Sequence, residues 1–209
     1  DCFRAETVAL PALADGQILV AQRFLSLDPY MRPRMTELRS YTPPFELDKP
    51  LTGGSVGEVV ESKNPRYAKG DIVMGMLNWA THTVHDGKGL RKIDPALAPV
   101  STALGILGMP GMTGYFGLMD VGQPQAGETL VVSGAAGAVG QTVGQMAKIK
   151  GCRVVGIAGG AAKCEWVVKE LGFDACIDYK AGPIKDGLKQ HCPQGVDIYF
   201  DNVGGEILD

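Results

Sequence analysis

The sequence predicts an α/β protein built in two parts, and three observations support this fold class. The stretch TLVVSGAAGAVGQTVGQMAKIK, at 129–150, has the pattern of a buried strand, a tight glycine turn and a helix. Strand and helix patterns then alternate to the end of the chain, whereas 1–99 holds short strand segments separated by turns. We therefore predict a β-rich domain at 1–100 and a doubly wound parallel sheet at 101–209.

The first strand pattern follows a turn signal formed by Asp15 and Gly16. In the segment QILVAQRFLSLD, the apolar residues Ile18, Val20 and Phe24 fall on alternate positions. Such a period of two is typical of a strand with one buried face.

Two further segments of the first part have strand character, and two others do not. TGGSVGEVVES and KGDIVMGML are rich in β-branched residues and are bounded by glycine turns. SLDPYMRPRM and YTPPFELDKP are broken by prolines and are expected to be irregular. Short strands with this punctuation predict a small β-barrel or sandwich.

The composition changes near Ser101, where the spacing of apolar residues becomes helical. Pro110 interrupts this spacing. It predicts one helix that ends near Gly108 and another that holds Pro110 in its first turn.

The second part contains the elements of a doubly wound sheet. After the strand at 130–132, helical apolar spacing is found at Val139, Val143, Met146 and Ala147. The alternation then predicts strand Arg153–Ala158, helix Ala161–Leu171, strand Ala175–Tyr179, helix Ile184–His191 and strand Val196–Asn202. A complete fold of this kind has about six strands, so we expect the domain to be incomplete at the C-terminus.

The composition excludes several classes of partner. The chain has 209 residues, of which 45% are hydrophobic and 21% charged, and its net charge is −3. Without a basic patch, nucleic acid and acidic membrane surfaces are poor partners. No apolar run of about 18 residues or more is present, so we expect a soluble, cytoplasmic protein.

The cysteines and histidines do not predict a metal site or a disulfide framework. The five cysteines include no CxxC pair. His82 and His85 lie three apart in a strand-like segment, so their side chains are expected on opposite faces.

The glycine turn is a candidate phosphate site. In GAAGAVG, Gly137 and Gly140 match the second and third glycines of the dinucleotide-binding pattern, and Ala135 stands at the first. A helix N-terminus offers unpaired N–H groups and a positive dipole end to a pyrophosphate. The alternative is a turn that only packs the helix on the sheet.

The residues after the second strand favour NADP over NAD. NAD sites place Asp or Glu about 20 residues after the glycine turn, where this chain has Gly159 and Gly160. Lys163 and Tyr179 are positioned to reach a 2′-phosphate. The alternative is that Lys163 is a surface lysine and Tyr179 a strand-end aromatic residue.

Four stretches carry a resemblance to a known family: LSLDPYMRPRM, TGGSVGEVVES, LGMPGMTGYFGLMDVGQPQAGETLVVSGAAGAVGQTVGQMAKIKGCRVVGIAGG and YFDNVGGEILD. They span nearly the whole chain. The sequence resembles the zinc-independent medium-chain dehydrogenase/reductases, in the branch that contains prostaglandin reductase, plant alkenal double-bond reductases and bacterial curcumin reductase.

The resemblance implies a GroES-like substrate domain followed by a Rossmann domain, with NADPH between them and a homodimer for the full-length protein. The cofactor-side residues that it implies are Thr113, Gly137, Ala138, Val139, Gly140, Lys163, Tyr179 and Asn202. Zinc enzymes of the wider superfamily have a GHE motif where this chain has Thr52, Gly53 and Gly54. The resemblance therefore implies no catalytic zinc.

The implied reaction is hydride transfer from NADPH to the β-carbon of an α,β-unsaturated ketone or aldehyde. Tyr30 and Tyr41 are the candidate donors to the carbonyl oxygen. Either tyrosine can instead anchor a proline-rich loop, and the family's best-known catalytic tyrosine has no counterpart in these residues. Two alternatives remain: an NADPH quinone oxidoreductase and a catalytically silent, nucleotide-binding fragment.

Overall fold

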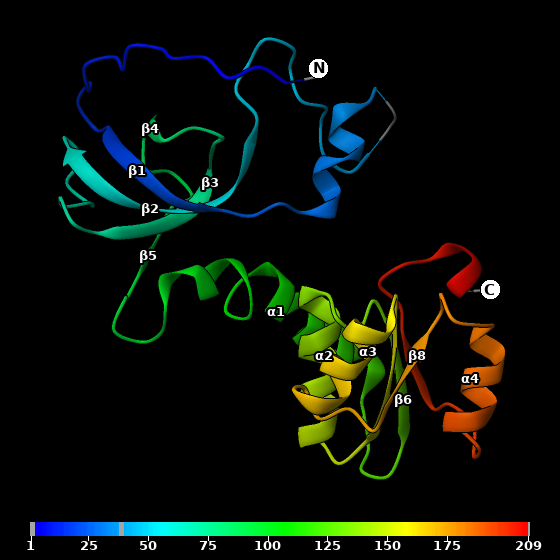
Figure 1. Cartoon of the computed structure of the whole chain (residues 1–209). Coiled ribbons are helices and arrows are strands. Elements are labelled where there is room, and N and C mark those ends of the chain that lie inside the picture. The colour runs from blue at the N-terminus through cyan, green and yellow to red at the C-terminus, as the bar shows by residue number, and fades with distance from the viewer. Residues whose placement is uncertain (1–2, 38–39, 209) are drawn as a thin grey trace. The chain divides into compact units, whose positions relative to one another are not determined.

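The computed structural model describes residues 3–37 and 40–208. The chain divides into two compact units, residues 1–104 and 105–209. Each unit has a sheet and a hydrophobic core of its own (Figure 1).

The first unit is built on an antiparallel sheet. In the described part of the chain its strand order is β4-β1-β2-β3-β5. The strands are β1 (Ile18–Leu25), β2 (Thr52–Ser62), β3 (Ile72–Asn78), β4 (His82–His85) and β5 (Arg91–Ile93). Short 3-10 helices occupy Pro29–Met31, Pro33–Met35 and Val100–Leu104. The predicted strand segments are confirmed, and they join in one sheet.

The inward face of β1 departs from the predicted alternation at one residue. Ile18 and Val20 are fully buried, as expected, but Phe24 is 45% exposed. The pairing of β1 with β2 shifts register between Gln22 and Phe24, which indicates a β-bulge. The bulge turns Phe24 out of the core, so this prediction was wrong.

The second unit is built on a parallel sheet with the strand order β8-β7-β6-β9 in the described residues. This is the 3-2-1-4 order of a Rossmann sheet, and it confirms the predicted fold class. The strands are β6 (Thr129–Ser133), β7 (Arg153–Ala158), β8 (Ala175–Asp178) and β9 (Ile198–Phe200). The helices are α1 (Met109–Phe116), α2 (Ala138–Ile149), α3 (Ala161–Lys169) and α4 (Ile184–His191).

Alternate residues of β6 pack against helices on opposite faces of this sheet. Leu130 and Val132 belong to the cluster that includes residues of α2 and α3. Val131 belongs to the cluster that includes Ile184 and Leu188 of α4. Figure 1 shows α4 on the other side of the sheet from α2 and α3. Two buried faces explain why this strand has no alternation in its sequence.

Three predicted boundaries were wrong. The helix expected to end near Gly108 is a 3-10 turn at Val100–Leu104, because Gly105 breaks the pattern. α3 stops at Lys169 rather than Leu171, since Gly172, at φ +73°, turns the chain back toward the sheet. β9 is shorter than predicted, and the chain turns directly after it.

No helix in the described part of the chain combines the length and apolar character needed to cross a membrane.

Candidate functional site

The start of α2 lies against the end of β6. Gly134 follows β6 with φ +58°, a conformation that glycine adopts readily. A Cβ atom on Gly140 would overlap the Gly134 carbonyl oxygen. The helix can therefore approach the strand only because residue 140 is glycine.

This close approach exposes a set of backbone donors. The first bond of α2 runs from the Gln141 N–H to the Gly137 carbonyl oxygen, at 3.0 Å. The N–H groups of Ala138, Val139 and Gly140 precede it and have no acceptor within the helix. Among the described residues, no side chain caps this end of α2. The turn is therefore suited to bind an anion.

The alanine at the first glycine position has a packing explanation. Ala135 is fully buried, and its N–H donates to the Ile157 carbonyl oxygen at 3.0 Å. Its methyl group lies 2.8 Å from where a Cβ on Gly156 would stand. Because position 156 of β7 is glycine, the Ala135 methyl group fits where the usual pattern has a glycine.

One buried hydroxyl links the ends of β6 and β9. Ser133 Oγ donates to Asp201 Oδ1 at 2.7 Å and accepts the Asn202 N–H at 2.7 Å. Asn202 Nδ2 also donates to the Ser133 carbonyl oxygen at 2.9 Å. The connections that follow β6 and β9 leave toward opposite sides of the sheet. Doubly wound sheets bind ligands at such a point. Asn202 is therefore held beside the Gly134 turn.

The Asp201 carboxylate is stabilised in its charged form. Desolvation acts to raise its pKa, but hydrogen bonds from Ser133, Tyr199 and the N–H groups of Val203 and Gly204 hold the pKa below its usual value. The carboxylate thus fixes the turn after β9 and, through Ser133, the position of Asn202.

The turn after β7 gathers the residues predicted for a 2′-phosphate. Tyr179 Oη lies 2.6 Å from where a Cβ on Gly159 would stand. Lys163 is exposed in the first turn of α3, and its N–H bonds the Gly160 carbonyl oxygen at 3.1 Å. The Lys163 backbone and the Tyr179 ring therefore lie at the same turn.

Sequence reasoning missed Asp178, which organises this turn. Its Oδ1 accepts the N–H of Gly160 at 2.8 Å and the N–H of Lys180 at 3.0 Å. These two backbone bonds lower its pKa. Asp178 and Gly160 are distant in the sequence and meet only because β7 and β8 are neighbours in the sheet, so no local sequence pattern predicts this bond.

Thr113 is exposed on α1. That helix packs on α2 through Gly114, where an added Cβ would lie 3.2 Å from Thr142 and Val143 side-chain atoms. Thr113 thus lies on a different element from the other predicted cofactor residues.

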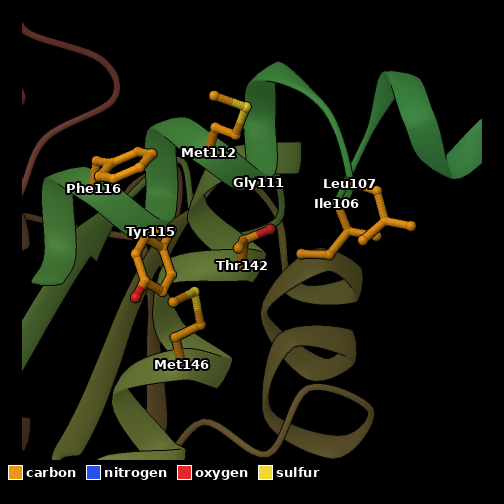
Figure 2. Close-up of a pocket in the computed structure, with 8 residues that line it drawn as sticks. All are labelled: Ile106, Leu107, Gly111, Met112, Tyr115, Phe116, Thr142 and Met146. Carbon is orange, nitrogen blue, oxygen red and sulfur yellow. The ribbon is translucent and has the colours of Figure 1, made fainter. Parts of the chain in front are cut away.

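An open, apolar groove of about 350 Å³ lies along α1 and α2. Figure 2 shows Tyr115 and Met112 from α1 and Met146 from α2 lining it. The Thr142 hydroxyl also lines it but donates to the Ala138 carbonyl oxygen at 2.9 Å. None of the residues predicted to contact cofactor lines this groove, whose lining is mainly apolar.

The two candidate proton donors of the first unit differ in environment. Tyr30 is half-buried, and its hydroxyl lies 3.9 Å from the Met76 sulfur. Burial, and then the nearby Asp28 carboxylate, raise the pKa of Tyr30. Tyr41 is 85% exposed. Tyr30 is therefore the better-ordered phenol.

The residues around Gly53 do not fit a zinc ion. A side chain at position 53 would begin 2.7 Å from Met31 Cε and 3.0 Å from both Leu25 Cδ1 and Trp79 Nε1. Within the described residues, no group of three or more His, Cys, Asp or Glu side chains is arranged to hold a metal. Trp79 Nε1 is buried here without a hydrogen-bond partner in that part of the chain. The place of a zinc-ligating histidine is filled by other side chains.

Two family models match the chain. The model described as the N-terminal domain of oxidoreductase matches residues 1–93, and the model described as zinc-binding dehydrogenase matches residues 138–209. The second description names a metal that the residues around Gly53 do not accommodate.

Similar proteins extend over nearly the whole chain. The Bacillus subtilis (strain 168) protein YfmJ is 56% identical over 208 residues, which are 99% of this chain and 61% of YfmJ. The NADPH-dependent curcumin reductase of Escherichia coli (strain K12) is 48% identical over 207 residues, 99% of this chain and 60% of that protein. The crystal structure of CurA from Vibrio vulnificus in complex with NADPH has a TM-score of 0.91 and 46% identity, covering 98% of this chain and 60% of CurA.

The chain spans about 60% of the length of these relatives. Their similarity covers both units, including the glycine turn and the DNVGG segment. The chain belongs to the medium-chain dehydrogenase/reductase family, in the branch that contains curcumin reductase and prostaglandin reductase.

Proposed function

We propose that this protein is an NADPH-dependent reductase of the C=C bond in α,β-unsaturated ketones and aldehydes. The observation that carries the proposal is the turn after β7. Glycines occupy 159 and 160, where NAD sites place an acidic residue, and the Asp178 carboxylate at this turn already accepts the N–H groups of Gly160 and Lys180. The Lys163 backbone and the Tyr179 ring both lie at this turn, which supports a site for a 2′-phosphate.

The chain's own residues would divide the binding of NADPH between them. The N–H groups of Ala138, Val139 and Gly140 face the pyrophosphate, with Gly137 opening the turn. The Lys163 ammonium and the Tyr179 hydroxyl bind the 2′-phosphate. Asn202, held by Ser133, lies along the cofactor, with Thr113 as a further neighbour from α1.

When bound, NADPH would supply a hydride for the β-carbon of the substrate. A hydrogen-bond donor would stabilise the negative charge that develops on the carbonyl oxygen, and the resulting enolate would take a proton at its α-carbon to complete the reduction. Tyr30 serves this role better than Tyr41 on geometric grounds. A tyrosine hydroxyl is protonated at neutral pH, and the Tyr30 side chain is half-buried whereas Tyr41 is 85% exposed.

Relatives support the substrate class. The similar proteins include the curcumin reductase of Escherichia coli and the 2-alkenal reductase of Nicotiana tabacum, which is 46% identical over 197 residues. CurA of Vibrio vulnificus has been crystallised with NADPH. We extend this chemistry to the present chain, with residues 1–100 as the substrate domain and 101–209 as the nucleotide domain.

The proposal includes a cytoplasmic homodimer. Sedimentation of the purified protein tests the assembly, and fractionation of cells tests the location.

Turnover assays test the reaction. The purified protein is mixed with NADPH and, at matched concentrations, an enone, an enal or a quinone, and the loss of NADPH absorbance is followed. We expect the enone and enal to be consumed, with much slower turnover when NADH replaces NADPH. Preferential consumption of the quinone would instead support a quinone oxidoreductase.

Calorimetric titration with NADPH separates binding from catalysis. Binding without turnover of any enone or enal would support the silent, nucleotide-binding alternative. Absence of both would contradict the proposal.

A further inference from the structure

We infer that Gly159 and Tyr179 form a coupled pair that selects NADP over NAD by steric exclusion. This inference rests on the proposed function and names the part of the site that would enforce its cofactor preference. The phenol of Tyr179 occupies the space in which an acidic ribose-binding side chain would have to stand.

The contact between the two residues leaves no room for a side chain. A Cβ atom on Gly159 would lie 2.6 Å from Tyr179 Oη, 2.7 Å from Cζ and 3.0 Å from Cε1. Real Cβ atoms essentially never approach other heavy atoms within 3.0 Å. Any residue other than glycine at position 159 therefore displaces the Tyr179 ring.

The backbone on either side cannot relieve this contact. Ala158 is paired with Asp178 in the parallel ladder of β7 and β8. The Tyr179 N–H donates to the Ala158 carbonyl oxygen at 3.2 Å, and the Gly160 N–H donates to Asp178 Oδ1 at 2.8 Å. Residue 159 thus lies between two residues that are tied to the end of β8.

The ring is the part that can move. Tyr179 is 44% exposed, so its side chain can swing toward solvent when position 159 is filled. Its hydroxyl would then leave the turn that also bears Lys163. An uncharged substitution at 159 is therefore expected to weaken phosphate binding, although it adds no repulsive charge.

In this arrangement, a carboxylate that binds a ribose 2′-OH and a phenol that binds a 2′-phosphate exclude each other. A carboxylate at 159 and a phenol at 179 compete for one volume. An aspartate at 159 would repel a 2′-phosphate and would also remove Tyr179 from it. The preference for NADP is then set by packing before any cofactor arrives.

The first test is the variant Gly159→Ala, with NADPH and NADH affinities measured by calorimetric titration. A hydroxyl bonded to a charged phosphate contributes enough that its loss lowers NADPH affinity by about tenfold. NADH affinity should change by less than about twofold, since NADH lacks the phosphate. Gly182→Ala is the matched control, because its Cβ meets no atom within 4 Å, and it should leave both affinities unchanged.

The second test is a double-mutant cycle. Tyr179→Ala should lower NADPH affinity by a similar factor, and adding Gly159→Ala to it should cost nothing more. Independent, additive losses would overturn the inference while leaving the proposed function standing. A wild-type protein that binds NADPH no more tightly than NADH would overturn both.

Folding gives an independent readout. If Gly159→Ala alone lowers the melting temperature, the steric pair predicts that Tyr179→Ala restores it, because the smaller side chain removes the overlap. Failure of the second substitution to restore stability would contradict the pair.

Discussion

Two glycines at the end of β7 stand where a carboxylate would bind a ribose, and a lysine lies one turn further along α3. Lys163 is exposed and Lys169, at the other end of the same helix, is ion-paired with Glu165. The two lysines carry the same charge and lie on the same helix. They differ in their distance along α3 from the turn at Gly160.

The variant Lys163→Ala should weaken NADPH binding by about tenfold or more, because a charge-assisted phosphate contact contributes roughly 1.5–3 kcal/mol. NADH binding should stay nearly unchanged. Titrations of both cofactors check this, with Lys169→Ala as the control that leaves both affinities as they are. Equal losses for NADPH and NADH would reject the assignment of Lys163 to the phosphate.

Asp174 illustrates a structural rather than a functional carboxylate. Both of its oxygens lie 2.9 Å from Lys148 Nζ of α2, and Oδ2 also accepts the Val154 N–H at 2.6 Å. Desolvation acts to raise its pKa, but the Lys148 and Val154 bonds prevail and the pKa is lowered. One side chain therefore joins α2, β7 and the loop before β8.

Replacing Asp174 by Asn should lower the free energy of unfolding by about 1 kcal/mol at neutral pH. Because the folded pKa lies below the unfolded value, the charged form stabilises the fold above about pH 4, and this contribution is lost as pH falls through the folded pKa. Urea unfolding of wild type and variant should thus converge in acid. Asp120→Asn, at an exposed position, is the control and should show no such convergence.

Candidate binding residues could be proposed from local patterns, whereas the contacts that hold them in place could not be predicted. Lys163, Tyr179 and Gly140 belong to local patterns at fixed offsets from a strand. Ser133 and Asn202, by contrast, are 69 positions apart in the sequence. Their contact exists only because β6 and β9 are neighbours in the sheet, so a single sequence gives no signal for it.

At the scale of elements, the first turn of α2 is the part whose geometry most restricts substitution. It needs glycine at 140 for its approach to β6, and we propose that its N–H groups bind the pyrophosphate that NADPH and NADH share. A change here should therefore act on both cofactors alike, unlike a change at Lys163.

Gly140→Ala should weaken NADPH and NADH binding by similar factors and lower stability by about 1–3 kcal/mol, since the added methyl group overpacks against backbone. Titration and urea unfolding measure the two effects. Gly122→Ala provides the comparison, because its Cβ would meet neighbours no closer than 3.5 Å. Selective loss of NADPH alone would show that the turn does not bind the shared pyrophosphate.

Element types followed from the sequence where the surroundings are simple. The bounds of β7 and α4 agree with the prediction at both ends. The predicted alternation failed at Phe24, where the bulge depends on the pairing of β1 with β2. The end of β9 failed for a similar reason, because Asp201 turns the chain by bonding the N–H groups of Val203 and Gly204.

At the scale of the whole molecule, a cofactor that binds only the folded chain must stabilise it. At a concentration 100 times its dissociation constant, NADPH would add about 2.7 kcal/mol to the free energy of unfolding. We expect the melting temperature to rise by several degrees. Thermal unfolding across an NADPH series checks this, with NADH at equal concentrations giving a smaller rise. An unchanged melting temperature at all NADPH concentrations would contradict the binding proposal.

The two tryptophans of the chain lie in different environments, which makes their fluorescence useful. The chain has two tryptophans, one beside Gly53 in the first unit with its Nε1 buried, and Trp166 on α3, which is 39% exposed. Trp79 is half-buried, and an indole less exposed to water fluoresces at shorter wavelength, so we expect the first unit to emit at the shorter wavelength. Trp166 is three residues after Lys163 and shares its side of the helix. The longer-wavelength band should therefore respond when the turn after β7 is occupied, while the shorter-wavelength band reports on the packing around residue 53.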